Sequence, residues 1–254
     1  MSRDEEFRRL REIVKQLRTD CPWDREQTHE SLRQSFIEET YEAIEAIDAG
    51  DWSELKIELG DVLLHIVLQS AIAEERNEFT IEDVLRHIND KLVRRHPTIF
   101  GDRSAIDSAT QKRNWEKIKI SEGRHSVVEG VPKEMPALLR AMRLQEKASK
   151  VGFDWKNSEE VWKKVEEELR ELHEAIGRGE NGQIADEFGD VLFSLVNYSR
   201  FLHLDPEHAL RETSNKFIRR FNYIEEKLRE GKKDIYATTL AELDALWNEA
   251  KDAL

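Results

Sequence analysis

The 254-residue chain has few of the residues that cross-link a fold or interrupt regular structure. Its single cysteine, Cys21, excludes a disulfide framework and a cysteine-rich zinc site, and it fits a reducing, cytoplasmic location. Only 5 prolines and 11 glycines are present. Long segments are therefore uninterrupted, which argues against an all-β fold.

Long hydrophobic runs are missing as well. The longest, residues 62–73, is interrupted by His65 and Gln69, so no transmembrane helix is expected. The N-terminal segment MSRDEEFRRLREI lacks the apolar centre of a signal peptide. With 40 Lys and Arg against 53 Asp and Glu, the formal net charge is −13, which disfavours a nucleic-acid or membrane surface. An anionic ligand would need a positive group to mediate its binding.

What is present is a long internal repeat. Residues 36–64 (FIEETYEAIEAIDAGDWSELKIELGDVLL) match residues 165–193 (VEEELRELHEAIGRGENGQIADEFGDVLF) at a constant offset of 129. This period is too long for a solenoid, so it indicates two homologous domains in tandem. We place the N-terminal domain at residues 1–120, a linker at 121–135 and the C-terminal domain at 136–254.

Both halves have the pattern of small helical bundles, which predicts an all-α fold. Apolar residues recur at spacings of three and four, as at Ile37, Tyr41 and Ile44, and Ser53 and Thr80 are plausible N-terminal caps. The predicted helices are 4–18, 29–49, 53–76, 80–95 and 109–120, then 137–150, 158–177, 181–203, 206–230 and 238–252.

Acidic residues fall at helical spacings on both sides of the turn within each repeat. The first set is Glu38, Glu39, Glu42, Glu58 and Asp61, and the second is Glu167, Glu168, Glu171, Glu187 and Asp190. If the two helices of each repeat return antiparallel, the acids face one another and would repel without a cation. Oxygen ligands without cysteine favour Mg²⁺ or Mn²⁺.

A solvated helix face is the ordinary explanation for such acidic runs. Two features argue against it here. The ELGD and EFGD acids lie inside otherwise apolar helices, where a carboxylate needs a partner. The spacing is also duplicated, although duplication by itself shows only common descent.

The chain resembles the MazG-type nucleoside triphosphate pyrophosphohydrolases over nearly its whole length. The resemblance rests on EExxE followed sixteen residues later by ELGD or EFGD, on CPWD at 21–24 and on RRHPTIF at 94–100. Thr98 and Ile99 stand where the family usually has His and Val. The resemblance implies an all-α, Mg²⁺-dependent homodimer that releases a nucleoside monophosphate and pyrophosphate from nucleoside triphosphates.

The same resemblance implies roles for the acids. The second-domain metal ligands are Glu168, Glu171, Glu187 and Asp190, and the first-domain ligands are Glu39, Glu42, Glu58 and Asp61. Glu167 would contact nucleotide or position the attacking water, with Glu38 as its first-domain counterpart.

Substrate contacts are implied at Lys216, Arg220 and Trp247. Lys216 and Arg220 lie four apart and could meet phosphate oxygens, although an ordinary surface helix would look the same. The Trp247 ring could stack on a base or pack in the core against its neighbours. The corresponding residues of the first domain are Lys91, Arg95 and Trp115.

The two domains differ beside their acids. Lys163 and Lys164 precede the second set, whereas Gln34 and Ser35 stand at the equivalent positions. Lys164 should help to hold phosphates, so we expect the second site to contribute more of the activity. In the family, the first domain can be impaired.

Other functions remain open at this point. The main alternative is a non-catalytic helical module that binds a nucleotide or a partner protein, and another is a relative with a narrower substrate. His65 follows Asp61 at a helical spacing, but Ser194 replaces it in the second copy, which disfavours a di-iron centre. No glycine-rich phosphate loop is present, and no base or sugar preference can be predicted.

Overall fold

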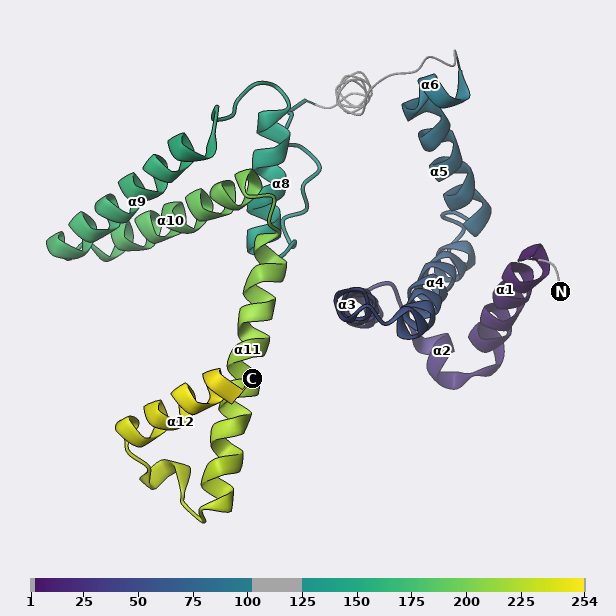
Figure 1. Ribbon diagram of the computed structural model, residues 1–254. Helices are drawn as coiled ribbons and strands as arrows, with labels where there is room; N and C mark the ends of the chain where they lie inside the picture. The colour runs from purple at the N-terminus through teal and green to yellow at the C-terminus, as the bar shows by residue number, and fades with distance from the viewer. Residues whose placement is uncertain (1–2, 102–124, 254) are drawn as a thin grey trace. The chain divides into compact units, whose positions relative to one another are not determined.

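The computed structural model describes residues 3–101 and 125–253. It divides into two compact units, residues 1–107 and 108–254 (Figure 1). All regular structure in the described residues is helical, so the predicted all-α fold is confirmed. Residues 125–135, which belong to the predicted linker, form turns and bends without a helix. The end of the first domain at residue 120 and the predicted helix 109–120 lie outside the described residues.

The first unit contains a hairpin of two helices, α3 and α4, and four further helices in the described residues. Its helices are α1 (Arg3–Asp20), α2 (Pro22–Glu26), α3 (Arg33–Ala49), α4 (Trp52–Glu75), α5 (Ile81–Arg95) and α6 (Pro97–Phe100). The short helices α2 and α6 were not predicted, although each begins with proline, which suits the first helical position.

Of the two predicted N-terminal helix caps, the structure confirms one and contradicts the other. Thr80 caps α5 in a reciprocal capping box with Asp83, as expected. Ser53 does not cap α4: the Asp51 side chain does, by accepting hydrogen bonds from the backbone N–H groups of Ser53 and Glu54. Asp51 is the better cap because its carboxylate accepts both bonds at the positive end of the helix.

The core of the first unit fixes the position of α4. Helix α1 packs on α4 through Val14, Val67 and Ile72. At the end of α1, the buried Arg18 guanidinium donates to the Glu75 carboxylate of α4, with Nε 2.8 Å from Oε1. These contacts anchor the C-terminal half of α4, so its N-terminal half, which carries acids, faces α3.

The second unit repeats the hairpin. Its elements are α8 (Ala137–Ser149), α9 (Ser158–Arg178), α10 (Asn181–Phe201), α11 (Pro206–Glu230), the 3-10 helix η1 (Ile235–Ala237) and α12 (Leu240–Ala253). Helices α9 and α10 form the hairpin, α8 packs on α10, and α11 packs on α8 and α12 (Figure 1). Val161, Val165 and Val196 are buried in this unit.

Candidate functional site

A glycine in the left-handed conformation closes each hairpin. Gly50 ends α3 with φ 67°, and Gly179 ends α9 with φ 73°. Residues with a Cβ atom are disfavoured in this conformation, which ends a helix abruptly and lets the chain return antiparallel. The acidic faces of the paired helices are thereby turned toward one another.

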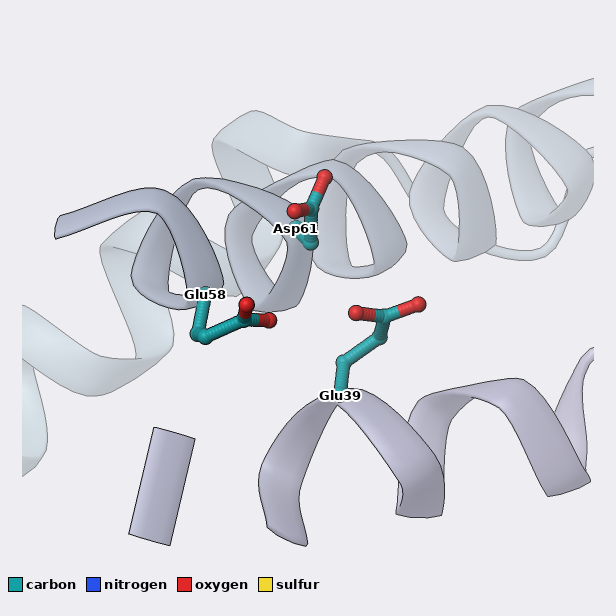
Figure 2. A group of neighbouring side chains, drawn as sticks. All are labelled: Glu39, Glu58 and Asp61. Atoms are coloured by element: carbon teal, nitrogen blue, oxygen red, sulfur yellow. The ribbon is translucent and has the colours of Figure 1, made fainter. Parts of the chain in front are cut away.

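In the first unit, three carboxylates meet between α3 and α4. Glu39 lies on α3 and Glu58 and Asp61 lie on α4, and one oxygen of each lies within 4.8 Å of the others (Figure 2). Partial burial raises the pKa of Glu39, and the charges of Glu42 and Asp61 raise it further. Burial and then Glu42 raise the pKa of Glu58. All four acids therefore share one electrostatic site.

In the second unit, the equivalent carboxylates meet between α9 and α10. One oxygen each from Glu168, Glu171 and Glu187 lies within 4.8 Å of the others. Partial burial raises the pKa of Glu187, and the charges of Glu171 and Asp190 raise it further. Asp190 is outside the closest group of three, but it is near enough for its charge to raise the pKa of Glu187.

Both acidic groups fit a hard divalent cation. Glu58 is 8% exposed and Glu168 is 6% exposed, so each group holds a carboxylate largely out of water beside other carboxylates. A positive charge close to these carboxylates stabilises such an arrangement. Each group offers only carboxylate oxygens, which suit ions such as Mg²⁺ or Mn²⁺.

Lys164 distinguishes the second group from the first. Its Nζ lies 2.7 Å from a Glu168 oxygen and 2.8 Å from a Glu167 oxygen. These hydrogen bonds raise the pKa of Lys164 and lower the pKa of Glu167, so both groups are charged at neutral pH. Ser35 occupies the equivalent position in the first unit and cannot supply a charge.

A cavity of about 660 Å³ opens beside the second acidic group. Lys164, Glu168 and Asp190 line one part of it. The remaining wall comes from α8, α10 and the loop before α9, and includes Gln145, Phe153, Asp154, Trp155, Phe193, Asn197 and Arg200. These seven residues were not predicted as site residues. The available signal was the Phe153-Asp154 pair, which matches Trp23-Asp24 of the first repeat.

The structure does not bring every predicted substrate contact to this cavity. Lys216, Arg220 and Trp247 lie on α11 and α12 and are not among its lining residues. The Arg220 Cζ lies 5.6 Å from the centre of the Trp247 ring, which also packs on Phe217 with ring centroids 5.3 Å apart. They form a separate cationic and aromatic group. Trp115, the suggested first-domain counterpart of Trp247, lies outside the described residues.

His65 lies beside the first acidic group but does not extend it. It is buried, and its ring stacks on Phe36 with centroids 5.5 Å apart. It is not part of the carboxylate group in the described structure.

Both repeats of the chain match a known protein family. The family model for the MazG nucleotide pyrophosphohydrolase domain matches residues 27–100 and 156–224. A Thermotoga maritima protein named nucleoside triphosphate pyrophosphohydrolase/pyrophosphatase MazG is 47% identical, over 96% of this chain and 95% of that protein.

Two further relatives cover the chain almost completely. The nucleoside triphosphate pyrophosphohydrolase of Escherichia coli K12 is 35% identical, over 96% of each chain. The Bacillus subtilis protein YabN is 46% identical, over 97% of this chain and 52% of its own length. This chain therefore belongs to the MazG nucleotide pyrophosphohydrolase family, and the prediction that it is an enzyme of that family is confirmed.

Proposed function

We propose that the chain is a Mg²⁺-dependent hydrolase that cleaves nucleoside triphosphates between the α and β phosphates. The observation that carries this proposal is the second acidic group, which opens on a cavity large enough for a nucleoside and has Lys164 at its edge. Small-molecule sites usually enclose about 300–1,000 Å³. The relatives named as pyrophosphohydrolases support the same reaction.

The proposed metal ligands are Glu168, Glu171, Glu187 and Asp190 in the second unit and Glu39, Glu42, Glu58 and Asp61 in the first. When bound, Mg²⁺ neutralises phosphate charge and makes a coordinated water more acidic. Attraction to the cation would favour the ionised carboxylates and so lower the pKa values that are raised at Glu39, Glu58 and Glu187.

Lys164 and Glu167 have complementary roles in this proposal. While Lys164 pairs with Glu167, the carboxylate is a weak base because its pKa is lowered. A triphosphate draws the Lys164 ammonium toward its own oxygens. Glu167 is then released to accept a proton from water. The water oxygen bonds to the α-phosphorus, the bond from that phosphorus to the bridging oxygen breaks, and pyrophosphate leaves with the electron pair.

Lys216 and Arg220 are proposed to bind phosphate oxygens beyond the acidic group. Their spacing of one helical turn suits two neighbouring phosphates. The Trp247 ring supports the Arg220 guanidinium in this arrangement. Stacking of Trp247 on a base stays a prediction.

A homodimer is proposed from the apolar surface of the hairpins. Leu169 of α9 and Phe188 and Leu192 of α10 are exposed, as are Ile37 of α3 and Leu59 of α4. Large exposed apolar patches are typical of interaction surfaces. Light scattering should give twice the chain mass, and Phe188→Asp should reduce the measured mass.

Among the described residues, the structure contains no helix with the length and hydrophobicity of a membrane span.

The reaction is tested with purified protein and the common triphosphates, with Mg²⁺ and with EDTA. We expect a nucleoside monophosphate and pyrophosphate with Mg²⁺ only. In ¹⁸O-labelled water, attack at the α-phosphorus places the label in the monophosphate. Nucleoside diphosphate and orthophosphate would contradict the proposal, and tight binding without turnover would favour a non-catalytic module.

A further inference from the structure

A turn of the linker segment reaches the cavity beside the second acidic group. Val128 is among the residues that line this cavity, although it lies before α8 in the chain. The residue is 43% exposed, so a ligand in the cavity can reach it. An accessible apolar side chain in a cavity wall is typical of a surface that binds the apolar part of a ligand.

The turn that carries Val128 is closed by its own hydrogen bonds. The Glu129 carboxylate accepts from the backbone N–H groups of His125 and Ser126, at 2.8 and 3.3 Å. Gly130 follows in the left-handed conformation, with φ 76°. A turn closed in this way holds Val128 in place before a ligand arrives, which reduces the entropy that is lost on binding.

Lys147 fastens this turn to α8. The residue is only 6% exposed, and its Nζ donates to the Glu129 carbonyl oxygen at 2.6 Å. A buried ammonium is unfavourable without acceptors, so this hydrogen bond stabilises the turn against the helix. Leu144 and Ala148, on either side of Lys147 in the sequence, line the same cavity. The position of Lys147 therefore sets the position of Val128.

This part of α8 lies beside α10 beyond the acids. The Gln145 Nε2 donates to the carbonyl oxygen of Phe193, which follows Asp190 on α10. Lys147 and the turn that it holds continue along α8 from there. Val128 is therefore placed to meet the nucleoside of a ligand whose phosphates lie at the acidic group.

We propose that the turn at residues 125–130 is part of the nucleotide site: Val128 contacts the nucleoside of a bound triphosphate, and Lys147 is a positioning residue that holds Val128 there. This rests on the proposed function, which places the phosphates at the acidic group. The segment that joins the two repeats thus contributes to the second site. Because the contact is made with the nucleoside alone, its loss should raise KM and leave kcat nearly unchanged.

The first test is Val128→Ala, which shortens an accessible side chain and leaves the hydrogen bonds of the turn in place. We expect the KM for ATP to rise roughly fivefold, because two methyl groups in contact with the ligand are lost. Inorganic tripolyphosphate has no nucleoside, so its inhibition constant should stay the same. Val151→Ala makes the same change at an exposed residue outside the cavity lining and should leave the KM unaltered.

The second test is Lys147→Met, which keeps the side-chain length and removes the hydrogen bond to the turn. The KM for ATP should rise at least as much as in Val128→Ala, again with little change in kcat. Combining the two substitutions should raise the KM little further, because the contact is already lost. Lys150→Met, at the exposed end of α8, is the matched control.

The outcomes separate this inference from the reaction itself. If no triphosphate is cleaved, the proposed function fails, and calorimetry with AMP tests the inference: binding that weakens in Val128→Ala supports it, and binding that is absent or unchanged overturns it. If triphosphates are cleaved, an unchanged KM in Val128→Ala overturns the inference, as does a changed inhibition constant for tripolyphosphate. Additive effects of the two substitutions would overturn the positioning role of Lys147. If Lys147→Met does not fold, the result for Val128→Ala stands alone.

Discussion

Each unit brings three of its four predicted ligands together, and the ligand left outside differs: it is Glu42 in the first unit and Asp190 in the second. The backbone of the two hairpins is closed in the same way, but the residues beside the acids differ. In the second unit, Lys164 binds Glu168 on the α9 side, whereas Ser35 leaves Glu39 free of such a bond. One lysine thus gives two copies of an acidic site different electrostatics.

The largest effect is expected on triphosphate hydrolysis, when the equivalent metal ligand is removed from one unit or from the other. Glu168→Ala should lower triphosphate hydrolysis by about a hundredfold or more, because it removes a buried ligand beside Lys164. Glu39→Ala, the matched change in the first unit, should lower it less. Pyrophosphate release gives the rates, and Mn²⁺ binding shows whether each ion site is lost. Equal losses would show that both sites contribute alike.

A smaller effect is expected from exchanging Lys164 and Ser35, which occupy equivalent positions beside the two acidic groups. Lys164→Ser should raise the KM for a triphosphate roughly tenfold, because a charge-assisted hydrogen bond to phosphate is lost. Mn²⁺ should bind more tightly to the same variant, since a competing cation is gone. Ser35→Lys should weaken Mn²⁺ binding in the first unit. An unchanged KM in Lys164→Ser would remove the lysine from substrate binding.

The pH dependence of stability should show how much the ionised carboxylates of each acidic group destabilise the folded chain. The pKa of Glu187 is raised in the folded chain, so its protonation favours folding. That contribution is complete below the ordinary carboxyl pKa and is lost as the pH rises through the raised value. In EDTA at neutral pH, Glu187→Gln should therefore raise the melting temperature by a few degrees.

Glu58→Gln provides the matched measurement in the first unit. We expect a larger increase there, because no lysine stands at the Lys164 position. Mg²⁺ should raise the melting temperature of the unchanged protein more than that of either variant. Melting curves in EDTA from about pH 4 to pH 8 would test this, and a lower melting temperature in both variants would contradict it.

The smallest effects concern two glycines of the second hairpin. Gly179→Ala should lower the free energy of unfolding by about 1–2 kcal/mol, because its φ of 73° disfavours a Cβ atom. Gly189→Ala, inside α10, should raise it by up to about 1 kcal/mol, since the added Cβ meets nothing within 4 Å in this chain. Urea unfolding measures both, and Gly50→Ala should behave like Gly179→Ala.

Most of the fold follows from local signals in the sequence. Apolar spacing and terminal glycines predicted the long helices to within a few residues, because these signals act within one or two turns. The start of α3 was wrong by four residues, at 29 instead of Arg33. Residues 28–32 form a turn in which Thr28 and Ser31 hydrogen-bond to each other, which competes with helix formation.

The approach of the acids to one another was predictable for the same reason, and the cavity was not. Glu168 and Glu187 belong to one hairpin, so their approach follows from helical spacing and a tight turn. Gln145 and Arg200 reach the cavity only because α8 packs on α10 and the loop before α9 folds over it. Such contacts depend on tertiary packing, which the periodicity of a single segment does not specify.

The left-handed glycines make each acidic centre self-contained. All the carboxylates that converge in one unit belong to two consecutive helices and the bend between them, so one continuous stretch of chain encodes the whole centre. Copying that stretch copies the centre intact, without any need to rebuild contacts between distant segments. The two copies could then diverge by changing the residues around them, as Ser35 and Lys164 illustrate.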